Sequence, residues 1–139
     1  MNLMMLLEMA SGGFGDRIAL GSAQSGLTVG DLYNQAGAAA AHFRGTNAEH
    51  IAMVDVTSTA LPISLFGPAW AGLPFVPVNY RLPDEELHSL LDRVSPALAI
   101  VEPTASSRAS NQEGIDVLAR PDLLEKVAGG NTPEADWEM

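Results

Sequence analysis

The sequence contains no cysteine, and only seven of its 139 residues are basic. The absence of cysteine excludes disulfide bonds, thiolate metal sites and a cysteine nucleophile, and it fits a reducing cytoplasm, where we expect the protein to be located. The basic residues face 17 acidic ones, so that the net charge is -10. No basic stripe is available to replace the counterions of a phosphate backbone, and we therefore expect no nucleic-acid partner.

The sequence also lacks an uninterrupted apolar run of membrane-spanning length. Residues 56–80 carry no charge, and a transmembrane helix needs about 20 apolar residues. This run is divided by Ala71-Gly72 and by four prolines, namely Pro62, Pro68, Pro74 and Pro77. The pattern predicts a buried helix followed by a buried strand, and no transmembrane segment. Residues 1–10 contain Glu8 and no basic side chain, which argues against a signal peptide.

What the chain does contain is an alternation of two periodic patterns. Its hydrophobic fraction of 47% and charged fraction of 17% are those of a globular domain with a real core. Helical spacing predicts helices over residues 2–9, 29–43, 60–71, 83–94 and 121–127. Short apolar runs predict strands over residues 17–20, 50–56, 75–78, 97–101 and 114–118. This alternation predicts an α/β fold, a mostly parallel sheet with helices on both faces.

Caps and breaks set the expected ends of these elements. Ser11–Gly15 should end the first helix, and Leu27 should pair back on the first strand as a hairpin. Thr28, followed three residues later by an acidic side chain, predicts a capping box for the second helix. Thr57–Thr59 should cap the third helix, and Pro68 should kink or loosen it because proline lacks a backbone donor.

The stretch from Phe66 to Leu87 is the most informative one. Gly72 can end a helix in the left-handed conformation, and the apolar run Phe75–Val78 follows as a strand. Pro83 then suits the first turn of a helix, where three acidic residues complement the helix dipole. We assign residues 1–128 to one α/β subdomain, and residues 129–139 to a linker with an acidic tail.

No complete catalytic constellation is present. Gly12–Gly15 precedes a strand, whereas a phosphate-binding loop follows one, so we interpret it as a turn. The three histidines fall on different elements, too scattered for zinc; they are His42, His50 and His88. Asp84–Glu86 stabilise a helix start and do not form a paired acid and base. Trp70 and Phe75 are interpreted as core residues. We therefore predict no catalytic residue and no metal ligand in this chain.

Arg81 is the one polar residue that stands out. It follows the strand 75–78 at its carboxyl end, which is where open α/β sheets bind ligands. One interpretation is a contact with an anionic ligand. The other is a structural arginine that ties a loop to a helix end or to an acidic neighbour, a common arrangement.

The order of these segments resembles the extreme N-terminal region of the adenylate-forming enzymes, the acyl-CoA synthetase and AMP-binding superfamily. The earlier part of the resemblance consists of Arg17–Leu20, Leu27–Leu32, Ala38–Gly45, Ile51–Met53 and Thr57–Thr59. Its best-matching part consists of Gly67, Ala71-Gly72, Val76–Asn79, Arg81-Leu82, the acidic helix and Leu98–Val101. Thr59 and Tyr80 stand where proline is usual in the family, and Pro68 stands where alanine is usual.

The resemblance implies the first subdomain of an acyl-CoA synthetase-like N-terminal domain. The family's phosphate loop, ribose-binding aspartate and catalytic lysine have no counterpart here, so the resemblance implies a fragment that precedes the nucleotide-binding portion. It implies a parent enzyme of fatty acid metabolism that uses ATP, Mg²⁺ and CoA to convert a carboxylic acid into its CoA thioester. For Arg81, it implies a contact with the CoA nucleotide phosphates.

Three further expectations follow. The isolated chain should be inactive, and its partner should be the remainder of the parent enzyme. Surface left exposed by truncation should favour self-association. Two alternatives stay open: a stand-alone α/β binding or interaction module, and a fragment of an acyl-AMP ligase or of a peptide-synthesis adenylation domain. Continuation of the reading frame past Met139 would separate the first alternative from an enzyme fragment.

Overall fold

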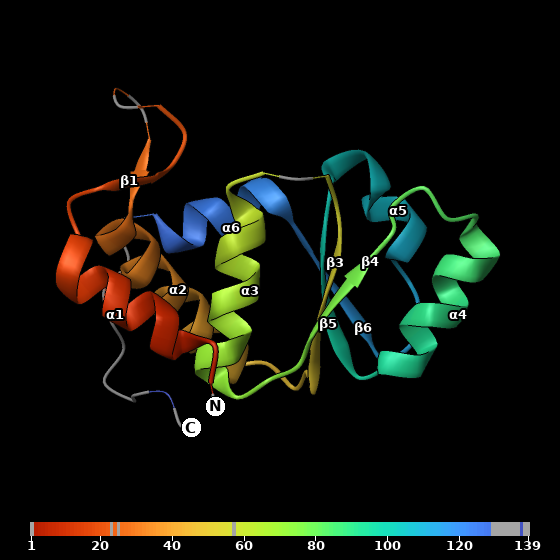
Figure 1. Ribbon diagram of the computed structural model, residues 1–139. Coiled ribbons are helices and arrows are strands. Elements are labelled where there is room, and N and C mark those ends of the chain that lie inside the picture. Colours follow the sequence, from red (N-terminus) through yellow and green to blue (C-terminus); the bar gives the residue numbers. More distant parts are fainter. Residues whose placement is uncertain (1, 23, 25, 57, 129–136, 138–139) are drawn as a thin grey trace.

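The computed structural model describes residues 2–22, 24, 26–56, 58–128 and 137. It contains a four-stranded parallel sheet with helices on both faces, as the sequence predicts (Figure 1). The predicted linker and tail at residues 129–139 lie outside the described residues, except for Trp137. No helix in the described ranges is long and apolar enough to cross a membrane.

The strands of the main sheet lie in the order β4-β3-β5-β6, and all neighbouring pairs are parallel. Their bounds are His50–Val54 for β3, Phe75–Val78 for β4, Ala97–Val101 for β5 and Ile115–Ala119 for β6. A separate antiparallel hairpin joins β1, Ile18–Leu20, to β2, Leu27–Thr28, which confirms the predicted pairing of Leu27. The central strands β3 and β5 are buried almost throughout.

The helices divide between the two faces of the sheet (Figure 1). One face is covered by α2, α3 and α6, with α1 outside them, and the other face is covered by α4 and α5. The helix bounds are Met4–Phe14 for α1, Val29–Arg44 for α2, Ala60–Ala71 for α3, Asp84–Val94 for α4, Ser106–Ala109 for α5 and Arg120–Val127 for α6. A short 3₁₀ helix, η1, spans Pro103–Ala105.

Side-chain alternation along the strands divides the core in two. Ile51 and Met53 of β3 point into the cluster under α2, α3 and α6, whereas Ala52 and Val54 point into the cluster under α4 and α5. The same alternation runs along β5, because parallel register places Ile51 opposite Leu98. Both faces of the central strands are therefore apolar, which explains their continuous hydrophobic sequence.

Several predicted boundaries are confirmed and others are wrong. The capping box of α2 forms, because the Thr28 hydroxyl accepts from the Asp31 N–H at 3.0 Å and the Asp31 carboxylate accepts from the Thr28 N–H at 3.2 Å. Gly72 ends α3 with φ of 78°. The strand β3 ends at Val54, two residues before the predicted end, so that Asp55 lies outside the ladder.

The prediction that Ser11–Gly15 breaks the first helix is wrong. The helix α1 continues through Ser11 and the two following glycines to Phe14. Its end is fixed by tertiary contact, because the Gly30 N–H donates to the Gly15 carbonyl at 3.0 Å. A Cβ atom at Gly30 would lie only 3.2 Å from that oxygen, so the close approach of α1 and α2 depends on glycine. Packing has overridden the low helix propensity of glycine here.

Among the described residues of the predicted cap of α3, Ser58 alone makes a side-chain bond to the helix start. Thr57 lies outside the described residues, the Thr59 side chain makes no capping bond, and the Ser58 hydroxyl accepts from the Ala60 N–H at 3.2 Å. The helix continues past Pro68 to Ala71. Bonds from outside the helix hold its last turn, since Arg44 Nη2 donates to the carbonyl of Trp70 at 2.9 Å.

A substitution at Gly67 tests the close contact between α2 and α3. A Cβ atom at Gly67 would lie 3.0 Å from the Ala39 Cβ and 3.0 Å from the Phe43 Cε2. We expect Gly67→Ala to lower the free energy of unfolding by about 1–3 kcal/mol, the usual cost of overpacking a well-filled core. Urea titration followed by circular dichroism measures this change.

Gly12→Ala is the matched control, because nothing lies within 4 Å of a Cβ atom added at Gly12. It should raise the free energy of unfolding by about 0.5–1 kcal/mol, since alanine is the better helix former. An unchanged or increased stability of Gly67→Ala would contradict the tight packing of α2 on α3.

Candidate functional site

Polar side chains gather at the carboxyl ends of the parallel strands. The connection after β3 leads to α3 on one face, while the connection after the neighbouring strand β5 leads to α5 on the other. Such a point of divergence is where open α/β sheets form a ligand-binding crevice. Asp55 follows β3 and Glu102 follows β5, so two carboxyl side chains lie at this point.

Asp55 is the most unusual group of this edge, because its side chain is fully buried. Its Oδ1 accepts from Arg120 Nη1 at 2.8 Å and from the Val56 N–H at 2.7 Å. Its Oδ2 is buried and meets no donor among the described residues. Arg120 opens α6 directly after β6, so this ion pair ties the end of β3 to the end of β6 across β5.

Glu102 lies beside this pair on a different network. Its carboxylate accepts from the Thr104 hydroxyl and from the Thr104 N–H, the latter at 3.0 Å. The hydrogen bond from the Thr104 hydroxyl is the main cause that lowers the pKa of Glu102, and Arg120 contributes a smaller coulombic effect in the same direction. Glu102 is therefore held as a carboxylate and is poorly suited to act as a general acid.

Arg81, the predicted ligand contact, lies at the end of β4 and is exposed. Its N–H donates to Asn79 Oδ1 at 2.9 Å, which forms a tight turn, and its Nε donates to the Tyr80 hydroxyl at 3.1 Å. The guanidinium carbon lies 5.5 Å from the centroid of the Tyr80 ring. Its other N–H groups meet no acceptor within the described residues, so Arg81 retains donors that face solvent.

The structural role considered for Arg81 belongs to Arg108 instead. Arg108 Nε donates to Asp84 Oδ1 at 2.6 Å, and its Nη1 donates to the carbonyl of Tyr80 at 2.7 Å. Its Nη2 donates to the carbonyl of Leu82. One guanidinium thus joins α5 to the turn after β4 and to the first turn of α4, which positions the segment that carries Arg81.

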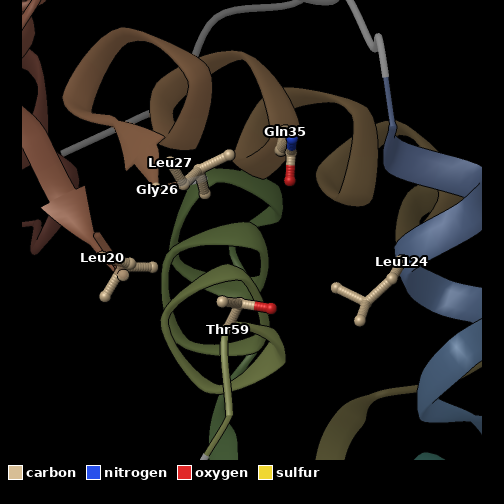
Figure 2. Close-up of a pocket in the computed structure, with 7 residues that line it drawn as sticks. Leu20, Gly26, Leu27, Gln35, Thr59 and Leu124 are labelled. Atoms are coloured by element: carbon tan, nitrogen blue, oxygen red, sulfur yellow. The ribbon is translucent and has the colours of Figure 1, made fainter. Parts of the chain in front are cut away.

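Apart from these polar groups, a hollow lies between the hairpin, α2, α6 and the start of α3 (Figure 2). It has a volume of about 300 Å³ and is lined by Leu20, Gly21, Gly26, Leu27, Gln35, Thr59 and Leu124. Figure 2 shows the side chain of Leu124 extending from α6 toward Thr59 at the start of α3. Among the described residues, no charged side chain lines this hollow, so it suits apolar contact and not acid–base chemistry.

Among the described residues, neither a cluster of metal ligands nor a phosphate-binding turn is present. No three His, Asp or Glu side chains among them converge on a possible metal position, so they form no metal site built from protein ligands alone. No glycine-rich turn in the described part follows a strand and opens a helix, so they do not fit the phosphates of ATP either. His88 and His42 lie on different helices, α4 and α2. The His88 ring contacts the carbonyl of Arg108. Burial is the main cause that lowers the pKa of His42, and the charge of Lys126 lowers it further.

Sequence reasoning missed Asp55, Glu102 and Arg120. The signal for Asp55 was present, because it is an acidic residue at the carboxyl end of a continuous apolar strand. Its partner Arg120 is 65 residues away in the chain, and no local pattern joins the two. Arg108 is likewise 24 to 28 residues away in the chain from its three acceptors, and no local pattern joins it to them.

The buried ion pair gives a quantitative test. We expect Arg120→Gln to lower the free energy of unfolding by about 3–5 kcal/mol, because it leaves the buried Asp55 carboxylate without its counter-charge. The double variant Asp55→Asn/Arg120→Gln should lose less than Arg120→Gln alone, since it removes both charges. Chemical denaturation of the two variants measures the difference.

Arg93→Gln is the control, because Arg93 is an exposed arginine of α4 without an ion pair in the described structure. It should change the stability by less than about 0.5 kcal/mol. If the double variant were as unstable as Arg120→Gln, the unpaired charge of Asp55 would not be the cause of the lost stability.

Comparisons with known proteins place these features in context. A family model described as AMP-binding enzyme matches residues 7–137. The benzoate CoA ligase from Burkholderia xenovorans LB400 is similar, with a TM-score of 0.80 and 19% identity over 98% of this chain and 30% of that one. The fatty acyl CoA synthetase of Mycobacterium tuberculosis gives a TM-score of 0.81 and 18% identity over 99% of this chain and 30% of that one.

The N-terminal subdomain of Klebsiella oxytoca NpsA, in complex with anthranilyl-AMSN, is also similar. Its TM-score is 0.73, with 23% identity over 97% of this chain and 35% of that one. A comparison with curated protein sequences finds no match. The chain thus spans 30–35% of the length of these three solved proteins, and at these identities the similarity concerns the fold.

Proposed function

The chain belongs to the family of AMP-binding enzymes, and on this premise we propose that it forms the N-terminal portion of an ATP-dependent acyl-CoA ligase. Such a ligase joins a carboxylic acid to AMP with release of pyrophosphate, and then transfers the acyl group to the thiol of CoA. The observation that carries the proposal is the family match over residues 7–137, together with the likeness to two proteins described as a CoA ligase and an acyl CoA synthetase.

The contribution of this chain is structural in the proposal. Its described residues form neither a metal site of protein ligands alone nor a glycine-rich phosphate turn, and this supports the proposal that the remainder of the parent enzyme, the partner we propose for this chain, binds Mg²⁺ and ATP. The same argument leads us to propose that the isolated chain is inactive. The absence of cysteine supports a cytoplasmic location for the enzyme.

Arg81 is proposed to contact a phosphate of CoA. Three features support this role: the side chain is exposed, the Tyr80 hydroxyl accepts from its Nε, and its remaining N–H groups face solvent. The first turn of α4 weakens the attraction for an anion, because it carries Asp84, Glu85 and Glu86 and only Asp84 is paired with Arg108. We therefore expect a modest contribution, comparable to that of an exposed ion pair.

An adenylation domain that passes its acyl group to another thiol is the second candidate. The likeness to NpsA supports it, because the N-terminal subdomain of that protein, described in complex with anthranilyl-AMSN, is 23% identical to this chain. The thiol that accepts the acyl group distinguishes the two candidate functions. A CoA ligase forms a thioester with free CoA, whereas the second candidate forms the acyl-adenylate and leaves free CoA unchanged.

The activity test compares two polypeptides. We expect the 139-residue chain to show no ATP–pyrophosphate exchange with any member of a panel of carboxylic acids, because the nucleotide is bound elsewhere. The protein encoded by the complete reading frame should show this exchange, and it should form an acyl-CoA thioester when CoA is added. Exchange by the 139-residue chain would contradict its proposed inactivity, and a complete protein without exchange would contradict the ligase.

The role of Arg81 is tested in the complete protein. Arg81→Ala should raise the KM for CoA by about 1.5-fold to fivefold, the range of one exposed charge contact, and leave the KM for ATP unchanged. Arg93→Ala, at an exposed position near the end of α4, should change neither constant. An unchanged KM for CoA in Arg81→Ala would contradict the contact.

A further inference from the structure

The two outer edges of the main sheet are the ends of the strand order β4-β3-β5-β6. Within the described residues, β4 and β6 each pair with a strand on one side only. Burial reflects this difference, because β5 is buried throughout, whereas Val117, Leu118 and Ala119 of β6 are only half-buried. The unpaired backbone groups of such an edge are a template for a further strand.

The outer edge of β6 offers both backbone donors and acceptors. The Ala97 N–H of β5 donates to the carbonyl of Gly114 at 2.9 Å, so Gly114 faces β5. A parallel strand bonds to one neighbour through every second residue, and Asp116 therefore faces β5 as well. It follows that Val117 directs its N–H and its carbonyl to the outer side, and that Ala119 directs its N–H there. We call these groups of Val117 and Ala119 the open edge.

The outer edge of β4 is protected by a proline. The Ile51 N–H of β3 donates to the carbonyl of Pro74 at 2.9 Å, so Pro74 faces β3. The same alternation turns Phe75 and Pro77 to the outer side. Proline has no N–H, which leaves the N–H of Phe75 as the single donor that β4 directs outward. Proline at such a position is a common protection of an edge strand, so the sheet has one protected edge and one open edge.

The connection after β6 indicates how far along the chain the missing strand lies. The helix α3 joins β3 to β4 over one face of the sheet, and α6 follows β6 on that same face. A right-handed crossover through α6 therefore runs in the direction from β3 to β4, away from the open edge. Residues 129–139 contain two glycines, a proline and three acidic residues, a composition that does not predict a strand.

A strand from a more distant part of the parent enzyme remains as the occupant. This chain covers 30% of the length of the benzoate CoA ligase and of the fatty acyl CoA synthetase to which it is similar. Val117 packs against the core cluster under α4 and α5, and Leu118 packs against the cluster under α2, α3 and α6. Both side chains are only half-buried, so a strand beside them would be apolar on both faces, as β5 is.

We propose that the open edge of β6 is the surface on which the remainder of the parent enzyme adds an apolar strand to this sheet. This inference rests on the proposed function, because it requires a parent chain that extends beyond these residues. It deepens that proposal by naming the surface at which the two parts of the enzyme join. Backbone hydrogen bonds hold the junction, and the half-buried side chains of Val117 and Leu118 become covered.

Hydrogen exchange in the protein encoded by the complete reading frame tests the proposal. Mass spectrometry with fragmentation resolves the exchange of single amides. The amides of Val117 and Ala119 should exchange at least about a hundredfold more slowly than unpaired amides, as the amide of Asp116 does within its ladder. The amide of Phe75 is the matched control, because it faces outward at the protected edge and should exchange fast. In the dilute 139-residue chain, the Val117 amide should exchange fast.

Three results would overturn the proposal. The first is a Val117 amide that exchanges as fast as that of Phe75 in the complete protein. The second is a Val117 amide that is already protected in the dilute 139-residue chain, which would mean that this chain covers its own edge. The third is protection in the complete protein that is lost on dilution, which would assign the edge to a second copy.

This measurement is independent of enzymatic activity. A complete protein that protects Val117 but shows no ATP–pyrophosphate exchange would support the open edge and contradict the ligase. A complete protein that forms an acyl-CoA thioester but leaves Val117 unprotected would contradict the open edge alone.

Discussion

The parallel pairing of β3 with β5 is the constraint on which the rest of this structure depends. A parallel ladder at the centre of a sheet satisfies its backbone groups from both sides and leaves two faces of side chains to be covered. Ile51 and Leu98 face one helical layer, and Ala52 and Ala99 face the other. The connection after β3 leads to α3 on one face and the connection after β5 leads to α5 on the other, which opens a divergence point at their carboxyl ends.

This divergence brings polar groups together at one edge of an otherwise apolar sheet. Asp55 follows a strand too buried to contain a charge, and Arg120 enters from the far side of β5 to pair with it. Arg108 performs a comparable task at the next strand end, where its guanidinium joins α5 to the segment around Arg81. The edge is thus held by arginines that are occupied within the fold, and Arg81 keeps donors that face outward.

Much of this architecture could be predicted because the patterns that encode it are local. The strands over Phe75–Val78 and Ala97–Val101 have the predicted bounds, since short apolar runs between helices have few other arrangements. The candidate site was harder to predict from the sequence. Asp55 was predicted within a strand because its apolar neighbours continue to Val56, and the ladder ends earlier where β4 and β5 end beside it. The helix α1 was predicted too short because a glycine pair normally ends a helix, whereas packing of Met4 and Leu7 stabilises it beyond that point.

The sequence alone determined the class of fold, the parallel character of the main sheet and the family of the chain. The first two depend on periodicity and on residues close together in the chain, such as Gly72 at a helix end or the acidic residues of the first turn of α4. The family rests on the resemblance in the order of these segments. Only the tertiary structure decided which arginine is structural, which carboxylate is buried and which face of α1 is exposed. These three features depend on contacts between residues that are distant in the chain. The hydrophobic pattern selects the fold but does not fix where the few polar side chains lie. Their positions follow from the packing of the elements.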